Sequence, residues 1–488
     1  MNRGMTGDEL ERLLYDVFVA CSDSVNIEQL ASMLEKPLET VKIAVSILVR
    51  LGYAKKLSIE PLNEESRVKW HSSWLAIRAA FTSPQRDRVQ LSGDTFSSSD
   101  LKSKRIGFVF DSSLTAFLMM GNLSAELKQH AVTMFEVGKL GEESVDDFLH
   151  ELGKIEPSSE GPSEGLYEHA VTLRSTLQTL RQHEGFSLPE CDYRLDLLRC
   201  ESLNQLNPTT RQRVLSNYAI LFSSAPMSVP SVGLQSPDVY NFGYPSPDFQ
   251  SPWFRLFVWA RACSGPPSVV FVKGSRVRRI PVMLPNSGQA MLSPWEASME
   301  PSRVDMRTVL ANVNESLLSS PVLLQACGPK RTVDILFPLP SIHSTDQAVT
   351  KVENCQSGCS EQIQYSEADM HKHPTVCKIV QDLKLGCSLG FIRLAKWQED
   401  WVPLEVHFGL PLFKDDMNQQ ALQAIRDHSL CSEKSLHTHR ENMQQLTSEL
   451  TDFIQKYQNK GSALSENVLS RYPMVPLAFD GKELSILS

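Results

Sequence analysis

The stretch from residue 106 to residue 120 reads IGFVFDSSLTAFLMM, and it places a short apolar run directly before a helical pattern. The run over residues 106–110 has the length and composition of a buried strand. Asp111 or Ser112 can cap the helix that follows, because their side chains accept hydrogen bonds from the first backbone N–H groups of a helix. This strand–helix unit opens a large mixed α/β domain, which we expect to extend over residues 105–480.

Upstream of this domain, residues 1–85 have the pattern of a winged-helix module. Apolar residues recur at helical spacing over residues 10–18, which predicts a first helix. Asn26 and Gln29 form a capping-box pair at the start of a second helix. A third helix is expected to end before Gly52, because glycine adopts the left-handed conformation that terminates helices.

Two short strands, over residues 53–57 and 68–70, complete the pattern of the N-terminal module. Three helices followed by a two-stranded ribbon predict a winged helix. The serine-rich residues 86–104 have no apolar period and are interpreted as a linker. The predicted fold class is therefore α+β, with a winged-helix module followed by a large mixed α/β domain.

Within residues 105–480, runs of apolar residues alternate with helical patterns. The predicted strands are residues 253–259, 268–273, 277–283, 332–337, 389–394 and 404–408. The predicted helices are residues 125–137, 143–153, 307–318, 417–427 and 432–458. Three polar inserts are expected near residues 156–165, 223–252 and 347–370. The second insert contains six prolines, so we interpret it as an irregular surface loop.

The last predicted helix carries an apolar stripe at alternating three- and four-residue spacing. The stripe consists of Leu436, His439, Met443, Leu446, Leu450, Phe453 and Tyr457. Such a stripe can pair with a partner helix in a coiled coil, or it can pack against the core of its own domain. Packing against the core is the commoner role for a single amphipathic helix.

The composition excludes several classes of protein. The chain has 488 residues, of which 41% are hydrophobic and 22% are charged. This is enough apolar material for sizeable cores, so a disordered chain, a collagen and a disulfide-stapled miniprotein are excluded. The net charge of −9 argues against a protein built mainly to hold nucleic acid.

Cysteine usage and hydropathy indicate the compartment. The ten cysteines follow no repeating spacing, which is typical of reduced thiols. Residues 1–14 have no apolar signal core, and no apolar run approaches the ~20 residues of a membrane span. We therefore expect a cytoplasmic protein whose membrane association is peripheral.

Catalytic motifs are scarce in this sequence. It has no GxxxxGK phosphate loop, no GxGxxG and no HExxH. One hydrolase pattern, GxSxG, matches Gly386-Cys-Ser388-Leu-Gly390, but that chemistry requires a helix after the serine and residues 391–394 favour a strand. We predict a turn here, and a protein that is not an enzyme and needs no cofactor. A hydrolase at Ser388 stays an alternative, because triads are assembled in space.

Asp111, Ser113 and Thr115 match the DxSxT metal-adhesion loop of von Willebrand-type domains. One carboxylate and two hydroxyls are oxygen ligands that a hard cation prefers. The commoner role of Asp and Ser after a strand is to cap a helix. We therefore predict no metal at these residues and keep a metal-dependent binding module as an alternative.

A second group of metal-ligand types falls in the third polar insert. It consists of Cys355, Cys359, His371, His373 and Cys377. Zinc requires four such ligands in a tetrahedron, but the CxxxC spacing is looser than the usual CxxC knuckle. We interpret the segment as a loop, and zinc binding stays open.

Four cations, Lys273, Arg276, Arg278 and Arg279, make one basic patch. In a strand, alternation would place Arg276 and Arg278 on one face. Such a patch can hold an anionic lipid or an acidic peptide, and it can also be an ordinary solvated surface.

The third helix of the N-terminal module exposes Lys42 and Arg50, which we predict as partner-binding positions. A DNA reader needs basic groups along this helix and its wing. The ribbon also carries Glu60, Glu64 and Glu65, which would repel phosphates. We therefore expect a protein partner, with a winged-helix nucleic-acid-binding regulator as the alternative.

The sequence resembles the FAM91 family in segments that extend over most of the chain. LLYDVF at residues 13–18, EQLA at 28–31 and RLG at 50–52 resemble the end of the family's N-terminal domain. DSSLTAFLMMGNLS at residues 111–124 closely resembles the start of its C-terminal domain. Further resemblance lies at residues 130–140, 195–203, 400–405 and 409–413.

The resemblance implies a non-enzymatic role in vesicle tethering. Members of the family act at the trans-Golgi network in a complex with a WD-repeat protein. With a TBC-domain adaptor, they help golgins capture endosome-derived vesicles. The resemblance supplies no catalytic residues. Family members also carry a long region before the winged-helix segment, so we expect this chain to be a fragment, a short isoform or a truncated gene model.

Overall fold

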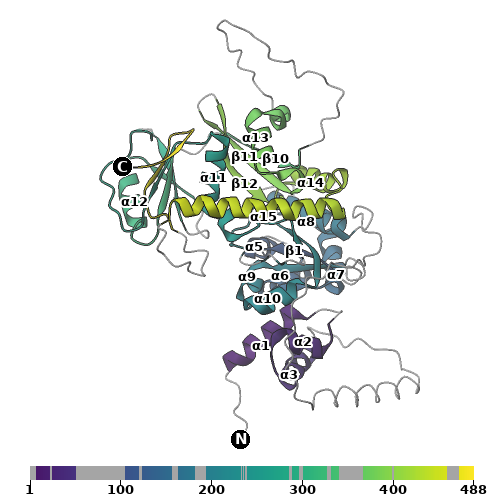
Figure 1. Cartoon of the computed structure of the whole chain (residues 1–488). Coiled ribbons are helices and arrows are strands. Elements are labelled where there is room, and N and C mark those ends of the chain that lie inside the picture. Colours follow the sequence, from purple (N-terminus) through teal and green to yellow (C-terminus); the bar gives the residue numbers. More distant parts are fainter. Residues whose placement is uncertain are drawn as a thin grey trace, which may run out of the picture. The chain divides into compact units, whose positions relative to one another are not determined.

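The structure of the protein is a computed structural model (Figure 1). It describes residues 7–21, 25–50, 105–119, 124–155, 163–181, 194–231, 234, 236, 239–284, 288–295, 301–326, 331–339, 367–397, 400–458 and 472–487. The chain divides into two compact units, Met1–Lys102 and Ser103–Ser488.

The first unit contains three helices that pack against one another. They are α1 (Gly7–Ala20), α2 (Ile27–Leu34) and α3 (Leu38–Arg50). The predicted capping box is confirmed, because the Gln29 N–H donates to Asn26 Oδ1 at 2.8 Å and the Asn26 N–H donates to Gln29 Oε1 at 3.0 Å. The predicted ribbon strands and the linker lie outside the described residues, so the winged-helix fold stays a prediction.

The second unit begins with a five-stranded, mostly parallel sheet. Its strands are β1 (Arg105–Phe110), β2 (Lys139–Leu140), β3 (Leu195–Arg199), β4 (Tyr218–Ser223) and β5 (Tyr240–Asn241). Their order is β2-β3-β1-β4-β5, with β1 parallel to both β3 and β4, and every residue of β1 is buried. The predicted strand at residues 106–110 is thus confirmed. The strand order reverses between β1 and β4, and such a reversal is where open α/β sheets commonly bind ligands.

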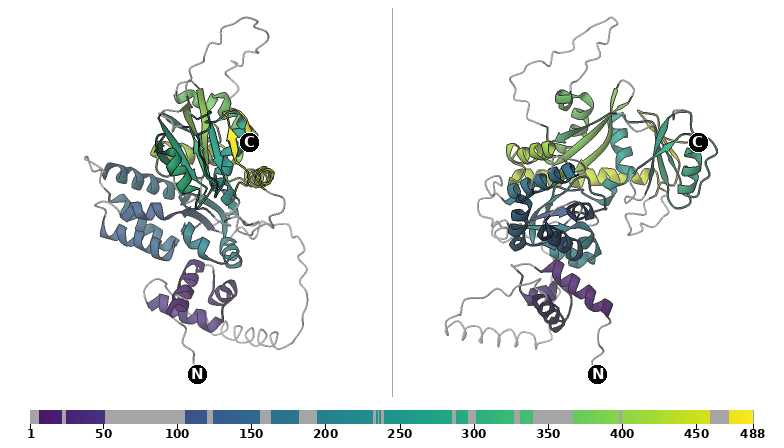
Figure 2. Two further views of the ribbon diagram at one scale, coloured as in Figure 1. Left: turned by 90° about the vertical axis from the view of Figure 1, so that its left-hand side faces the viewer. Right: turned by 180° about the vertical axis from the view of Figure 1, so that it is seen from behind.

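Helices join the strands of the parallel sheet, and Figure 2 shows α6, α7 and α8 stacked along one side of it. The helices are α5 (Ser112–Met119), α6 (Ala125–Val137), α7 (Glu142–Gly153), α8 (Ser163–Arg181), α9 (Cys200–Gln205) and α10 (Pro208–Leu215). The predicted cap of α5 is confirmed, because the Ser113 N–H donates to Asp111 Oδ1 at 3.1 Å.

A three-stranded antiparallel sheet follows later in the chain. It consists of β10 (Thr332–Phe337), β11 (Gly390–Trp397) and β12 (Asp400–Phe408), in that order. The predicted strands in these three places are confirmed. The helices that pack on it are α11 (Pro252–Ala262), α13 (Pro374–Asp382) and α14 (Asp415–Asp427), and short 3-10 turns are η3 (Pro247–Gln250), η4 (Glu367–Lys372) and η5 (Leu385–Cys387).

A six-stranded antiparallel sheet forms the end of the unit that holds the last residues of the chain. Its strand order is β14-β13-β6-β9-β7-β8. The strands are β6 (Ser268–Phe271), β7 (Gln289–Pro294), β8 (Ser302–Asp305), β9 (Val322–Gln325), β13 (Leu477–Phe479) and β14 (Leu484–Ile486), and α12 (Val309–Ser316) packs against β7, β8 and β9. An apolar core lies between α12 and this sheet.

The long helix α15 (Glu433–Lys456) packs against η5 and α11. Its buried residues are Leu436, His439, Met443, Leu446, Leu450, Phe453 and Ile454. The apolar stripe therefore packs on the chain's own core. Among the described residues, no helix has the length and apolar character needed to cross a lipid bilayer.

Three predictions for this unit are wrong. Residues 253–259 belong to a helix, α11, which Pro252 begins and in which apolar side chains surround the axis. Residues 277–283 contain no strand, although β6 is confirmed directly before them. The described part of residues 223–252 is not a surface loop, because many of its side chains, such as Phe242 and Tyr244, are buried. The predicted fold class, mixed helix and sheet, is confirmed.

Candidate functional site

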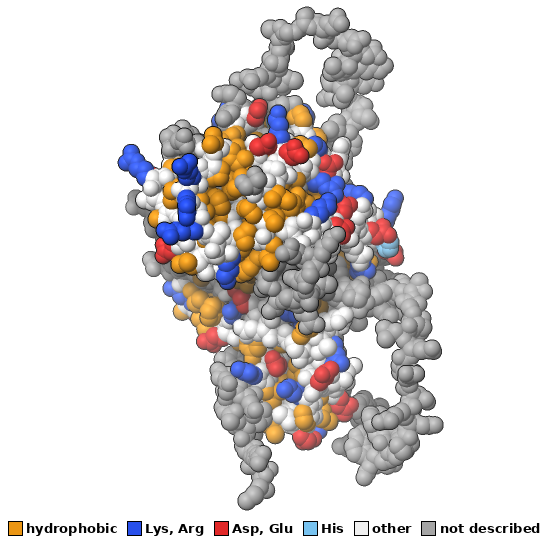
Figure 3. All heavy atoms as spheres, turned by 60° about the vertical axis from the view of Figure 1, so that its left-hand side comes forward, with side chains coloured by type: hydrophobic (Ala, Val, Ile, Leu, Met, Phe, Trp, Pro, Cys, Tyr) orange, Lys and Arg blue, Asp and Glu red, His pale blue; other side chains and the backbone are white. Residues whose placement is uncertain are grey.

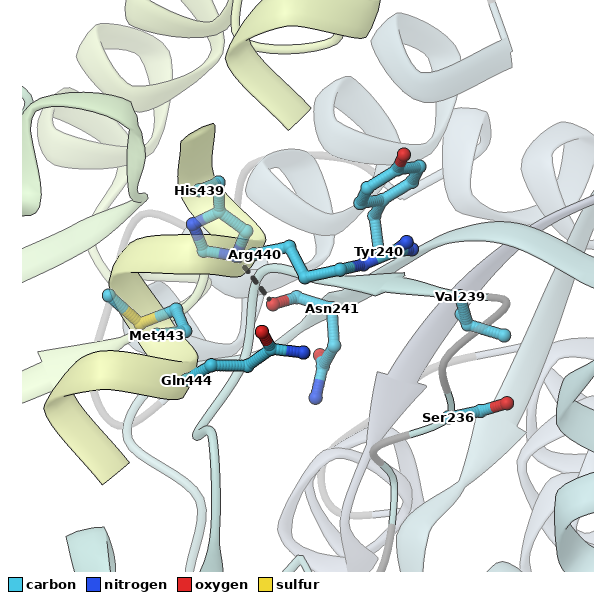
Figure 4. Close-up of a pocket in the computed structure, with 8 residues that line it drawn as sticks. All are labelled: Ser236, Val239, Tyr240, Asn241, His439, Arg440, Met443 and Gln444. Carbon is cyan, nitrogen blue, oxygen red and sulfur yellow. Dashed lines mark hydrogen bonds between the residues drawn. The ribbon is translucent and has the colours of Figure 1, made fainter. Parts of the chain in front are cut away.

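A cavity of about 330 Å³ lies between α15 and the segment around β5 (Figure 4). The Arg440 guanidinium lies over the Tyr240 ring, 3.8 Å from its centroid. This cation–π contact attracts the positive charge to the face of the ring. The wall combines polar groups with the apolar side chains of Val239 and Met443. Its lining residues are Ser236, Val239, Tyr240, Asn241, His439, Arg440, Met443 and Gln444.

His439, one of the cavity residues, joins three segments of the chain by hydrogen bonds. Its Nε2 lies 2.9 Å from the backbone oxygen of Asn241, which can only accept, so Nε2 carries the proton and donates. Its Nδ1 then accepts from the Ser388 hydroxyl at 3.0 Å. Burial lowers the pKa of His439 to about 4, so the imidazole is neutral near pH 7.

The Ser388–His439 pair resembles a nucleophile and its base only in composition. Ser388 has no exposed surface, so a substrate carbonyl has no approach to its Oγ. The other imidazole nitrogen faces a backbone carbonyl, whereas the acyl-transfer arrangement orients it with a carboxylate. A strand, β11, begins at Gly390, as predicted, in place of the helix that a nucleophile elbow requires. The geometry favours a structural link between α15, η5 and β5.

Asp111 lies at the carboxyl end of β1, where the strand order reverses. Both of its carboxylate oxygens are occupied by protein donors: Oδ1 accepts from the N–H and hydroxyl of Ser113, and Oδ2 accepts from the N–H and hydroxyl of Ser228. The Thr115 hydroxyl donates to the Ser112 backbone oxygen at 2.9 Å, within its own helix. The structure therefore brings Asp111 and Ser113 together and directs Thr115 elsewhere, so the three predicted oxygens do not converge on one point.

The cysteine–histidine segment is only partly within the described residues. Cys355 and Cys359 lie outside them. His373 caps α13, because its Nδ1 accepts from the Thr375 N–H at 3.3 Å, and Cys377 Sγ lies 3.7 Å from the backbone oxygen of His371. Among the described residues, no three His, Cys, Asp or Glu side chains gather as a metal site.

The four predicted cations of the basic patch are all exposed. They lie in residues 272–283, the segment after β6, which we call the basic loop. Figure 3 shows the side of the molecule that carries the six-stranded sheet, with Lys and Arg side chains beside a band of apolar surface. The predicted alternation of Arg276 and Arg278 does not apply, because the segment is not a strand, yet both side chains still face solvent.

The two predicted positions on α3 differ in what the structure describes. Lys42 is exposed and forms an ion pair with Glu39 at 2.9 Å. Only the backbone of Arg50 is described, as the last residue of α3.

A network of charges in the antiparallel sheet was not predicted from the sequence. Arg393 donates to both carboxylate oxygens of Asp334, at 2.7 and 3.1 Å, and Arg255 pairs with Glu405 at 2.9 Å. His407 Nε2 lies 3.0 Å from Glu405 and its Nδ1 lies 2.8 Å from the Tyr244 hydroxyl. Although burial opposes the charged form, the neighbouring cations hold the pKa of Glu405 well below its usual range.

This charge network joins α11 to the sheet. Its carboxylates are engaged by arginines, which hold them in ion pairs within the fold. Charged residues at inward positions of predicted strands are the signal that would have pointed to it.

Comparison with protein families identifies the chain. A model described as "FAM91 C-terminus" matches residues 102–399 and 393–473, and one described as "FAM91 N-terminus" matches residues 1–75. The chain belongs to the FAM91 family. The FAM91 models cover the cavity, Ser388, Asp111 and the basic loop in the second unit, and Lys42 in the first.

Two solved structures of D-alanine–D-alanine ligase from Bacillus anthracis are similar to this FAM91 chain at a low level. The one complexed with ATP has 12% identity and a TM-score of 0.36, and covers 69% of this chain and 99% of the ligase. The other has 10% identity and a TM-score of 0.33, and covers 71% of this chain and 99% of the ligase. At these scores, neither structure indicates the chemistry of this chain.

Proposed function

We propose that this FAM91 chain is a non-enzymatic vesicle-trafficking factor. In this proposal it belongs to a complex with a WD-repeat protein and, with a TBC-domain adaptor, aids golgin-mediated capture of endosome-derived vesicles at the trans-Golgi network. It acts in the cytoplasm and is peripheral on Golgi and vesicle membranes. The match of both FAM91 models is the observation that carries the proposal.

The site geometry is compatible with a role that depends on binding. The Ser388–His439 pair is buried and neutral, and the Asp111 carboxylate is filled by serine donors. In contrast, the cations of the basic loop and the Lys42 side chain are exposed on the surface. Surface groups of this kind contact partners, whereas buried polar groups hold the fold.

Affinity purification of the tagged chain, followed by mass spectrometry, tests the proposal. We expect to recover a WD-repeat protein and a TBC-domain adaptor. Recovery of chromatin proteins in their place would remove the trafficking role and favour the nucleic-acid-binding alternative. DNA binding that weakens steeply between low and physiological salt would then be the check.

Charge reversal separates the two candidate partner surfaces. We expect Lys42→Glu with Arg50→Glu to reduce recovery of partners bound through the first unit. Arg276→Glu with Arg278→Glu tests the second unit in the same way. Thermal unfolding at the wild-type temperature would show that either loss is a loss of binding. Unchanged recovery with a variant removes that surface as a protein-binding site.

A serine-directed fluorophosphonate probe tests the absence of hydrolase activity. Because the Ser388 hydroxyl is buried, we expect no labelling of the folded chain. Labelling that Ser388→Ala abolishes would contradict the non-enzymatic role.

A further inference from the structure

The basic loop is anchored to the six-stranded sheet at regular intervals. Val277, Ile280 and Met283 pack against the apolar core beneath α12. The Asn314 side chain of α12 holds the loop at a second point, because its Oδ1 accepts from the Val277 N–H at 2.8 Å and its Nδ2 donates to the Val277 backbone oxygen at 2.9 Å. The Gly274 N–H also donates to the Leu317 oxygen at 2.8 Å. The loop is therefore held in one conformation by both apolar and polar contacts.

These anchors determine which side chains face outward. The positions between Val277, Ile280 and Met283 hold four residues, of which Pro281 is half-buried and Arg278, Arg279 and Val282 are exposed. Val282 is 98% exposed, so it contacts almost nothing of its own protein and stands out from the surface. Leu318 follows the residue that Gly274 contacts, and it is 79% exposed. Two protruding aliphatic side chains thus accompany the cations.

The loop carries a charge opposite to that of the chain as a whole. The net charge is −9, while Lys273, Arg276, Arg278 and Arg279 are exposed close together. Among the described residues, none of these four cations forms an ion pair with a carboxylate. A local positive surface on an acidic protein attracts an anionic partner while the rest of the chain repels it.

We propose that the basic loop binds directly to an anionic membrane surface, with Val282 inserted at the level of the lipid headgroups. Burial of a protruding aliphatic side chain is favourable when the partner can deform to surround it and needs no preformed pocket. The headgroup boundary of a bilayer is such a partner. The flanking cations meet the negative surface potential at the same time. An acidic peptide would satisfy the cations and leave Val282 in water. The inference deepens the proposed trafficking function, on which it rests.

Co-sedimentation of the purified full chain with vesicles tests the inference. We expect binding to vesicles of phosphatidylcholine with phosphatidylserine, and no binding to phosphatidylcholine alone. Because each cation near an anionic surface contributes a factor of about five in affinity, Arg278→Ala with Arg279→Ala is expected to weaken binding about 25-fold. Val282→Ser is expected to weaken binding about fivefold while the dependence on salt stays as in the wild type.

Matched variants control for charge and folding. Arg426 on α14 and Lys434 on α15 are exposed cations, and replacing both by Ala removes the same charge elsewhere in the same unit. These variants are expected to bind vesicles as the wild type does. All replaced side chains are exposed, so thermal unfolding is expected to be unchanged.

Equal binding to neutral and anionic vesicles, no binding to either, or full binding by the loop variants would overturn the inference. If vesicles are not bound while the loop variants lose partner proteins, the loop is a protein-docking surface and the membrane inference is wrong. Affinity purification distinguishes the two proposals: recovery of the WD-repeat protein without vesicle binding leaves the trafficking function in place, and vesicle binding without such partners leaves only the membrane inference.

Discussion

Burial of His439 makes the stability of the second unit depend on pH. The pKa of His439 is lowered to about 4 in the folded chain, because the ring is desolvated between α15 and β5. In the unfolded chain, a histidine titrates near 6.5. Between these two values the unfolded state binds a proton that the folded state does not, so the free energy of unfolding rises with pH in this window and falls as the pH is lowered.

The magnitude follows from the difference between the two pKa values. About 2.5 units at about 1.4 kcal/mol per unit give a loss of roughly 3 kcal/mol between about pH 6.5 and about pH 4. Such a loss is a large part of the stability of an average domain. His439→Gln removes it, because a glutamine amide can still donate to the Asn241 oxygen and accept from Ser388 without titrating.

The assay compares the two proteins at several pH values. Hydrogen exchange of α15 peptides, together with denaturant unfolding, measures the free energy of opening at about pH 7, 6, 5 and 4. We expect His439→Gln to be less stable at neutral pH, and the difference from the wild type to shrink by roughly 3 kcal/mol at the acidic end. Other titrating groups contribute equally to both proteins and cancel in the difference.

His437→Gln supplies the matched control for this experiment. His437 lies on the exposed face of the same helix, with 66% of its side chain accessible. Its stability curve is expected to run parallel to that of the wild type. Parallel curves for His439→Gln as well would refute the reasoning, since they would mean that His439 takes up its proton equally in both states.

Three further predictions concern buried polar groups and glycine geometry. Tyr218 donates to the buried Asp196 at 2.9 Å, so Tyr218→Phe is expected to lower the free energy of unfolding by about 1.5–3 kcal/mol in denaturant titration. The lowered pKa of Glu405 contributes stability that is complete above about pH 4.3 and is lost as the pH falls toward the folded value, so Glu405→Gln should flatten the acid limb of the stability curve. A Cβ at Gly390 would lie 2.0 Å from the His407 backbone oxygen, whereas a Cβ at Gly386 would meet nothing within 4 Å. Gly390→Ala should therefore lower the unfolding temperature markedly and Gly386→Ala should not; equal temperatures would contradict this packing.

The elements predicted correctly are those whose sequence signals lie within a few residues of one another. The Asn26–Gln29 capping box and the strand before Asp111 depend on residues a few positions apart, and the structure confirms both. The helix α11 was missed because eight of its eleven residues are buried. A helix that is apolar on all sides shows no period, so its run of aromatic residues reads as a strand. Pro252 at its first position was the available signal.

The candidate sites were predicted less completely, because their residues are distant in the sequence. Ser388 and His439 stood in two separate patterns, a glycine-flanked turn and an apolar stripe, and Asn241 in a third segment. No spacing rule joins a serine to a histidine across such separations, since only the packing of α15 on η5 brings them together. The same limit applies to Arg393 and Asp334, which meet across two strands.

The basic loop shows how residues can be exposed as predicted although the predicted element is wrong. A strand that packed Val277 inward would have turned alternate residues inward, whereas the structure partly buries every third residue, namely Val277, Ile280 and Met283. Such a strand would have turned Arg279 inward with Val277, whereas the loop leaves both Arg278 and Arg279 outside, where no unpaired cation has to be buried. Arg278 would therefore be exposed in either arrangement, whereas the exposure of Arg279 depends on the irregular backbone. In a strand, Val282 would share the outer face with Arg278 as well, but only the structure shows that it is 98% exposed, so the membrane inference, unlike the basic patch, required the structure.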